Sequence, residues 1–400
     1  MTEQDELSRM LHEKVQAFDV RPSDVPQVEA RAGRIRARRR VAAVAAVAAA
    51  VVAAAVPAAL ALRPGDPSGA PVHPRPTAPT TSASTTTPAP SALSRMRQGR
   101  DPKVDWRQGR TVHLAGGRTL TLPDGIWDTF APYRGGVVAG STNDIADEVV
   151  VVGADGSVVS RGQGSAPVLS PDGSTVTWWS HSDGGSAFIS GPTSDAGRAD
   201  TRLPTTTQRP RAVGYLGDRL VYRVDSDTGG VAVSCGGSCT ITISGMTMVR
   251  AVDSGRRLLA GYADATCPTK VFHVPDLPGS ASRTVHVTSS WPCVRETPAT
   301  FSPDGSKLAL EHQDADGRFD GVRVRDSASG ELLMSYRTPV GVEVGSAVWD
   351  DDSHVLLDVY SPSYHQWTLL RVGLDRSVER AAPVIPGDDT QKPFSFGAQP

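Results

Sequence analysis

The sequence predicts an all-β fold, a β-propeller of about six or seven four-stranded blades, preceded by a single transmembrane helix and a short cytoplasmic helical tail. Three observations predict it: an apolar run near the N-terminus, a long succession of short alternating strands, and a turn sequence that occurs twice at a blade-like spacing. The 39 glycines and 31 prolines agree with many turns. A net charge of −2 over 400 residues gives no excess of cations, so the composition argues against nucleic acid as a partner.

Residues 1–40 read as a cytoplasmic tail. One short amphipathic helix is predicted before Pro22 by apolar residues near helical spacing: Leu7, Met10, Leu11, Val15 and Phe18. Two interpretations stay open, a helix lying at the membrane surface and a docking helix for a cytoplasmic partner, because one short helix is marginal in water without a surface to pack on. The tail ends in a membrane-flanking arginine cluster: Arg34, Arg36, Arg38, Arg39 and Arg40.

Residues 41–62 form an almost unbroken Ala/Val/Leu run, and about 22 apolar residues suffice for a helix to span a bilayer core. No charge or amide interrupts the run, which disfavours a helix buried in a globular core. Ala59-Leu60-Ala61 resembles a signal-peptidase site, but about 40 residues precede the run, so we expect a retained anchor rather than a cleaved signal. The arginine cluster on the N-terminal side predicts a single-pass protein of the cell membrane, with a cytoplasmic N-terminus and an extracytoplasmic C-terminal domain.

Residues 63–100 are rich in proline, threonine and serine. Such a composition cannot bury enough apolar surface to fold, so the segment is predicted to be an extended, disordered linker or stalk. It would lift the following domain away from the membrane.

Residues 101–400 show the alternation of short β-strands, with no convincing helix. The region opens on a hairpin around Gly116-Gly117, flanked by alternating apolar residues. We expect this hairpin to complete a blade with strands from the C-terminal end and so to close the ring.

The decisive feature is internal repetition. Leu169 and Phe301 each begin a Ser-Pro-Asp-Gly-Ser turn that an apolar strand follows, and the two copies lie 132 residues apart, about three units of roughly 44. Degenerate copies occur at 215–218, 252–255 and 348–353. Proline presets φ, aspartate bonds the following backbone and glycine takes the exit conformation, so each copy makes a tight reversal; a β-sandwich would not explain the spacing. The repeat-turn residues are Ser170, Pro171, Asp172 and Gly173, and Ser302, Pro303, Asp304 and Gly305.

These turns resemble those of the TolB-like family of WD40-like (PD40-type) β-propellers, over most of residues 101–400 and specifically in two repeats. The resemblance implies a radial propeller. The tail, arginine cluster and Ala/Val run loosely resemble actinobacterial membrane proteins, some of which are anti-sigma or sigma-associated regulators.

Four cysteines follow the apolar run: Cys235, Cys239, Cys267 and Cys293. Outside the cytoplasm, disulfides are favoured over metal ligands. Cys235 and Cys239 flank a three-residue Gly-rich loop and are predicted to pair across a hairpin, which leaves Cys267 to pair with Cys293. A zinc site is the alternative, although neither spacing matches a known zinc knuckle.

No catalytic, cofactor or metal motif was recognised. The sequence contains no Gly-x-Ser-x-Gly elbow, P-loop, dinucleotide fingerprint or His-Glu-x-x-His pair. Residues 314–320 superficially resemble a calcium loop but lack its closing glutamate. No cofactor is therefore predicted.

Three functions remain open. The first is a non-catalytic binding, scaffold or sensing propeller that holds a protein or envelope ligand on one face, anchored through residues 41–62. The second is a transmembrane, anti-sigma-like regulator that signals to a cytoplasmic partner through the tail. The third is a propeller hydrolase or lactonase, whose catalytic groups would converge from different blades at the channel mouth without a local motif.

Overall fold

The computed structural model describes residues 91–141, 147–182, 185–194, 199–205, 210–224, 230–234, 239–263, 267, 269–277, 283–389 and 392–400. The predicted tail, the apolar run and most of the linker lie outside these residues. Within them, no helix has both the length and the apolar character needed to cross a membrane.

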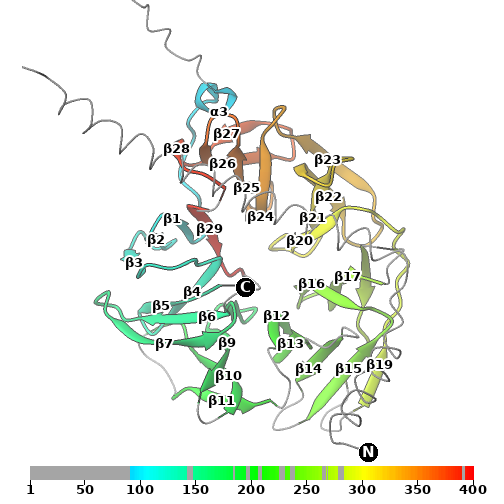
Figure 1. Ribbon diagram of the computed structural model, residues 1–400. Coiled ribbons are helices and arrows are strands. Elements are labelled where there is room, and N and C mark those ends of the chain that lie inside the picture. Colours follow the sequence, from blue (N-terminus) through cyan, green and yellow to red (C-terminus); the bar gives the residue numbers. More distant parts are fainter. Residues whose placement is uncertain are drawn as a thin grey trace, which may run out of the picture. The chain divides into compact units, whose positions relative to one another are not determined.

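The strands from residue 91 onward form consecutive antiparallel sets, and the sheets stand side by side around a ring (Figure 1). The N-terminal strands are β1 (Trp106–Gln108), β2 (Thr111–His113), β3 (Thr119–Thr121), β4 (Thr129–Tyr133), β5 (Gly136–Gly140), β6 (Glu148–Val152), β7 (Val158–Gly164), β8 (Val168–Leu169), β9 (Thr175–Ser182), β10 (Gly185–Pro192) and β11 (Thr201–Pro204). In the middle of the chain follow β12 (Arg211–Leu216), β13 (Arg219–Arg223), β14 (Val231–Ser234), β15 (Thr240–Ser244), β16 (Met248–Asp253), β17 (Leu258–Tyr262), β18 (Lys270–His273) and β19 (Arg283–His286). The C-terminal strands are β20 (Thr297–Phe301), β21 (Lys307–Gln313), β22 (Phe319–Asp326), β23 (Leu332–Arg337), β24 (Glu343–Asp351), β25 (His354–Ser361), β26 (Gln366–Gly373), β27 (Val378–Arg380), β28 (Ile385–Pro386) and β29 (Phe394–Gly397). The all-β prediction is confirmed, and sheets arranged radially in this way make a β-propeller.

The ring is closed by strands from the two ends of this region. β29 pairs antiparallel with β1, with Trp106 opposite Phe396, and β1 continues the sheet into β2 and β3. The predicted closure by the leading hairpin is therefore present. The hairpin turn differs from the expectation: Leu114 N–H bonds the Arg118 carbonyl at 2.9 Å, so three residues rather than the two glycines form the loop.

The two Ser-Pro-Asp-Gly-Ser turns have the same hydrogen bonds. In the second copy, Ser302 Oγ donates to Asp304 Oδ1 at 2.6 Å, and the Ser306 N–H donates to the same oxygen at 3.0 Å. In the first copy the corresponding distances around Asp172 are 2.6 and 3.0 Å. The turn glycines have φ of +67° and +66°, a conformation that residues with a Cβ rarely adopt, which explains why glycine occupies this place.

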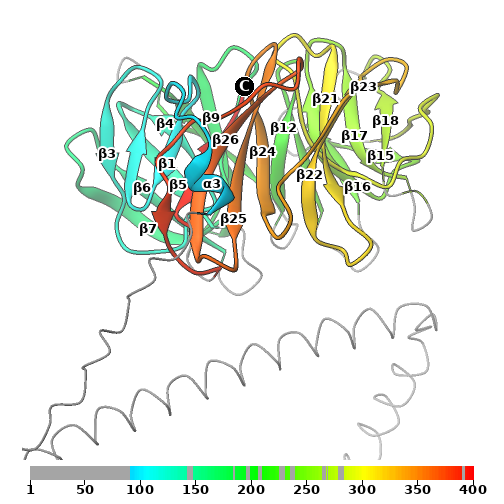
Figure 2. The same ribbon diagram turned by 90° about the horizontal axis from the view of Figure 1, so that it is seen from above.

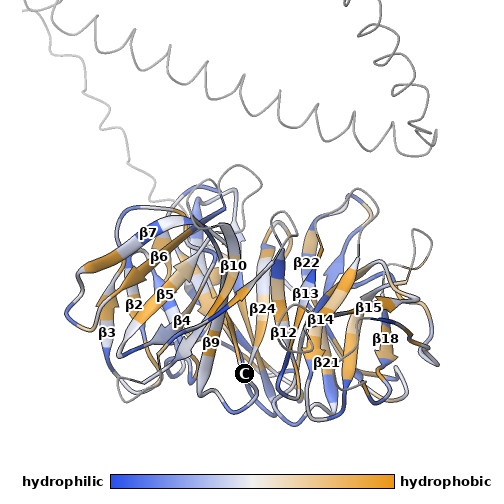
Figure 3. Ribbon diagram, turned by 90° about the horizontal axis from the view of Figure 1, so that it is seen from below, coloured by the Kyte–Doolittle hydropathy of each residue, from blue (hydrophilic) through white to orange (hydrophobic). Residues whose placement is uncertain are grey.

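Apolar side chains fill the spaces between neighbouring sheets. One cluster joins Val322 and Val324 of β22 to Val355 and Leu357 of β25, and another joins Val233 of β14 to Leu259 of β17. The hydrophobic residues follow the strands, whereas the connecting loops are more hydrophilic (Figure 3). Each buried Val or Leu contributes about 1.5–3 kcal/mol, so face-to-face packing of adjacent sheets holds the ring together.

The domain begins earlier than predicted. Residues 91–100, assigned to the disordered linker, include the short helix α3 (Ala92–Arg95; Figure 2). Leu93 of this helix is fully buried in a cluster with residues of β25 and β26. The Gly99 N–H bonds the Arg380 carbonyl at 2.8 Å, and the Arg380 N–H bonds the Arg97 carbonyl at 2.9 Å, so a single parallel bridge at Gln98 ties the chain to β27. Leu93 and Met96 are large apolar residues that pack into the core. The Pro/Thr/Ser-rich segment before residue 91 has few residues of this kind.

A buried arginine fastens this segment to the ring. Arg371 on β26 donates through Nε to Asp350 Oδ2 at 2.8 Å and through one Nη to Glu379 at 2.7 Å. Its two Nη atoms also donate to the carbonyls of Arg100 and Asp101, at 2.9 and 2.8 Å. The Arg371 side chain is 2% exposed and that of Asp350 is 0% exposed, so this ion pair is screened little by solvent.

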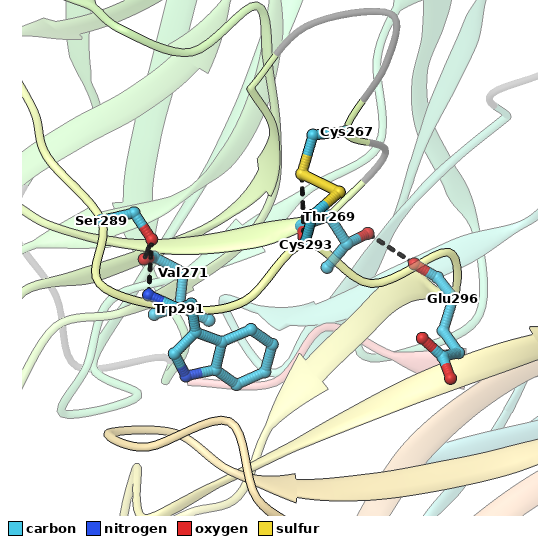
Figure 4. The surroundings of a disulfide bond; sticks show 7 residues. All are labelled: Cys267, Thr269, Val271, Ser289, Trp291, Cys293 and Glu296. Atoms are coloured by element: carbon cyan, nitrogen blue, oxygen red, sulfur yellow. Dashed lines mark hydrogen bonds between the residues drawn. A yellow bond between two sulfur atoms is a disulfide. The ribbon is translucent and has the colours of Figure 1, made fainter.

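The chain between β18 and β20 crosses from one sheet to the next and back. β19 pairs in parallel with β15 on the neighbouring sheet, after which residues 288–294 return along β18 through bridges to His273 and Thr269. The return is fixed by a disulfide between Cys267 and Cys293, with Cα atoms 5.5 Å apart (Figure 4). The pairing predicted for these two cysteines is confirmed. Cys235 lies outside the described residues, so its bond to Cys239 stays a prediction.

Candidate functional site

A cavity of about 500 Å³ lies where the innermost strands β12, β16, β20 and β24 face one another. Its wall also includes Leu169 of β8 and residues 399–400 after β29, so chain from most of the ring reaches it. The repeat turn at 302–304 and Pro171 of the other repeat turn lie at the same cavity. We call this space the axial cavity.

Backbone bulges aim side chains into the axial cavity. The register of β12 with β13 skips Val213, that of β16 with β17 skips Arg250, and that of β20 with β21 skips Ala299. All three residues line the cavity. A bulge leaves one residue outside the ladder and re-aims its side chain, which is common beside functional sites. Of these three equivalent positions, only the one on β16 carries a charge.

Arg250 is therefore the prominent cation of the axial cavity. Its guanidinium lies over the Tyr262 ring, 5.7 Å from the centroid, and it makes no hydrogen bond or ion pair to another described residue. An arginine has five N–H donors in a planar fork that matches carboxylate and phosphate groups. Here these donors are available to a molecule that enters the cavity.

A buried ion pair lies near the cavity residue Ala347, although neither of its members lines the cavity. Asp358 on β25 is fully buried, and Lys392 Nζ lies 2.7 Å from its Oδ2. Ser346 Oγ donates to Asp358 Oδ1 at 3.0 Å. A Cβ added at Gly345 would come within 2.8 Å of the Asp358 carboxylate, so only glycine allows this close approach.

The environment of Glu311 on β21 favours its neutral form. Burial and, next, the Asp358 carboxylate raise the pKa of Glu311, whereas Lys392, Arg250 and the Ala347 N–H lower it. The net result is a pKa of about 7, against the usual 4.5. Groups with such perturbed pKa values tend to cluster at functional sites. Arg250 of the axial cavity thus interacts electrostatically with Glu311, a carboxyl group that titrates near neutrality and that also interacts with the Asp358–Lys392 ion pair.

Replacing Glu311 tests this environment. In the folded protein its pKa lies above the unfolded value, so its contribution to stability is present below about pH 4.5 and is lost as the pH rises through about 7. We expect Glu311→Gln to gain, relative to wild type, on the order of 3 kcal/mol in unfolding free energy between pH 5 and pH 8, measured by urea denaturation. Glu331→Gln, the same change at an exposed turn, should show no such pH-dependent gain. An equal response of the two variants would contradict the assignment.

The structure brings together only part of what the sequence singled out. Of the repeat turns, Pro171 and residues 302–304 line the axial cavity, while the membrane-flanking arginines lie outside the described residues. Four of these charged residues were not predicted from the sequence: Arg250, Glu311, Asp358 and Lys392. For Arg250 a signal existed: alignment of the degenerate copy at 252–255 with the turn after Phe301 places Arg250 opposite Ala299.

The Asp314 loop is closed by its own backbone. Asp314 Oδ1 accepts the N–H groups of Asp316 and Arg318, at 2.8 and 2.9 Å. Asp320 Oδ1 lies 2.6 Å from His312 Nδ1. Within the described residues, no group of three or more His, Cys, Asp or Glu side chains is placed to hold a metal ion.

No protein-family profile and no curated protein sequence matches the chain. Solved structures do resemble it. TolB from Acinetobacter baumannii is 14% identical over 71% of this chain and 64% of its own, with a TM-score of 0.38. A prolyl endopeptidase is 14% identical over 70% of this chain and 47% of its own, with a TM-score of 0.47. A puromycin-hydrolysing peptidase from Mycobacterium tuberculosis is 17% identical over 72% and 53%, with a TM-score of 0.44. The chain thus spans less than two thirds of each of these proteins.

Proposed function

We propose that the protein is a membrane-anchored, extracytoplasmic β-propeller that acts as a non-catalytic binding module, with the axial cavity as its ligand or partner site. The observation that carries this proposal is Arg250, a cation aimed inward by a bulge and left without a hydrogen bond among the described residues. A group with carboxylate or phosphate chemistry on a protein or envelope ligand would complete its donors.

The ring in this proposal has seven blades. In order these are β29-β1-β2-β3, β4–β7, β8–β11, β12–β15, β16–β18 completed by residues 288–294, β20–β23 and β24–β27. The division agrees with a repeat of about 44 residues, of which about 300 residues hold a little under seven. A ring of this kind supplies a rigid frame on which side chains from different blades meet at the axis.

The anchor belongs to the same proposal. The apolar run at 41–62, with arginines on its N-terminal side, supports a single pass with the propeller outside the cytoplasm. The disulfide between Cys267 and Cys293 also supports this compartment, because such bonds persist in oxidising surroundings.

Photo-crosslinking tests the proposal. The full chain, expressed with benzoylphenylalanine in place of Ala299, is purified from the membrane fraction at its uncleaved mass, and crosslinked molecules are identified by mass spectrometry. We expect one species whose yield falls at least tenfold in Arg250→Ala and is unchanged in Arg283→Ala, a variant at an exposed position on β19. Equal yields in the two variants would overturn the axial site, and a soluble, shortened chain would overturn the anchor.

A further inference from the structure

A second cavity lies away from the axis, in the space that β8–β11 share with β12–β14. It has a volume of about 820 Å³, within the range of small-molecule sites. It adjoins the axial cavity at Pro171, Tyr215 and Ser254, but Asp172 lines only this second cavity, whereas Asp304 lines only the axial one. We call it the interblade cavity.

The walls of the interblade cavity combine apolar surface with hydroxyl groups. Phe188, Leu203, Leu220 and the Tyr215 ring provide the apolar part. Its hydroxyl groups come from Ser174, Thr175, Ser190, Thr201, Ser234 and Ser254. A wall that is both apolar and rich in short hydroxyls fits a neutral ligand with an apolar face and many hydrogen-bonding groups.

Ser234 offers a donor from the cavity wall. The residue is 9% exposed, and its Oγ accepts the Leu220 N–H at 3.0 Å. In that bond the Ser234 oxygen is the acceptor. No described residue accepts a hydrogen bond from the Ser234 hydroxyl group. A buried donor without an acceptor costs free energy, and a ligand oxygen at this point would satisfy it.

Asp172 offers acceptors at another part of the wall. Its Oδ1 accepts from Ser170 Oγ and the Ser174 N–H, and its Oδ2 accepts from Ser174 Oγ at 2.8 Å. These bonds lower the pKa of Asp172 to about 2, so the carboxylate stays ionised at physiological pH. A carboxylate has about four lone-pair sites, so Oδ2 keeps room for a ligand hydroxyl. Arg202 also lines the cavity, and one of its Nη atoms donates to the Gly185 carbonyl at 3.2 Å.

We propose that the interblade cavity binds a neutral saccharide. A sugar ring has an apolar C–H face for the Tyr215 and Leu203 side of the wall, and hydroxyl groups that both donate to Asp172 and accept from Ser234. An acidic sugar fits less well, because the wall carries two carboxylates, Asp172 and Asp218, against one cation, Arg202. The inference does not depend on the function proposed for the axial cavity.

Calorimetry with the full chain, solubilised in a detergent without a sugar headgroup, tests the inference. The probes are three neutral trisaccharides, maltotriose, cellotriose and triacetylchitotriose, with trigalacturonate as the acidic counterpart and choline as a cation. We expect at least one neutral trisaccharide to bind more tightly than trigalacturonate and choline. Failure of all three to bind at millimolar concentration, or tighter binding of trigalacturonate or choline, would overturn the inference.

The two repeat turns provide a matched pair of variants. Asp172→Asn and Asp304→Asn make the same change within nearly the same set of hydrogen bonds, but only the first alters the interblade cavity. Asp172→Asn should weaken trisaccharide binding about tenfold and Asp304→Asn should not. Thr201→Trp, at an exposed position on the edge strand β11, should abolish binding by filling the cavity. Equal losses in the two Asp variants would overturn the site, while Arg250→Ala should leave trisaccharide affinity unchanged.

Discussion

Arg371→Met is expected to lower the free energy of unfolding by about 3–5 kcal/mol, because it leaves the Asp350 carboxylate buried without its main partner. The substitution also removes the donors to the Arg100 and Asp101 carbonyls, so the chain at residues 100–101 loses its hydrogen bonds to β26. Chemical denaturation of the full chain measures the loss. Limited proteolysis should detect new cleavage near residue 100 under conditions in which wild type resists.

Two further variants make that result decisive. Arg337→Met removes an arginine whose side chain is 63% exposed and whose carboxylate partner lies 3.8 Å away, so it should cost less than about 1 kcal/mol. Arg371→Met combined with Asp350→Leu should recover part of the loss, because no buried charge then remains unpaired. A loss below about 1 kcal/mol for Arg371→Met alone would show that the ion pair does not fasten the segment.

Replacing both Cys267 and Cys293 by serine should cost about 3.5 kcal/mol of unfolding free energy in the chain-entropy model, because the bond closes a loop of 26 residues. The loop carries Trp291, which is 3% exposed and packs with Phe301 and Leu308. Its return along β18 is held by the bridges at Thr269 and His273 and by Ser289 Oγ, which donates to the Val271 carbonyl (Figure 4).

Non-reducing peptide mapping provides the control for this second prediction. It should find Cys267 linked to Cys293, and it also tests the sequence-based pairing of Cys235 with Cys239. Because that loop is much shorter, replacing Cys235 and Cys239 by serine should cost less, about 2 kcal/mol in the same model. A larger loss for the short loop than for the long one would contradict the assignment of stability to loop length.

Local chemistry explains what could be predicted from the sequence. The Ser-Pro-Asp-Gly-Ser turns satisfy their hydrogen bonds within six residues, so their conformation follows from the residues themselves. The alternation of strands and the repeat spacing then lead to the propeller. The closing hairpin was predictable because Val112 and Leu120 alternate with polar residues and need a sheet to join.

Contacts between residues that are distant in sequence explain which features could not be predicted. Residues 348–353 were predicted to be a degenerate repeat turn, yet Asp350 is buried against Arg371, and Asp351 forms the turn by accepting the Ser353 N–H. Glu311 has its pKa raised near Asp358 and Lys392, which lie 47 and 81 residues away in sequence. No local sequence pattern predicts that these three residues lie close together. The polar composition of residues 63–100 likewise gave no sign that Leu93 is buried in the core.

The attachment of residues 91–103 has a mechanical consequence. Tension applied to the chain at residue 91 first meets α3, the single bridge between Gln98 and Arg380 of β27, and the Arg371 hydrogen bonds. These bonds carry the load into the sheet β24–β27 before any of it reaches β1, whose pairing with β29 closes the ring. A propeller tethered from this side would therefore keep its ring closed under a pull that strips its linker.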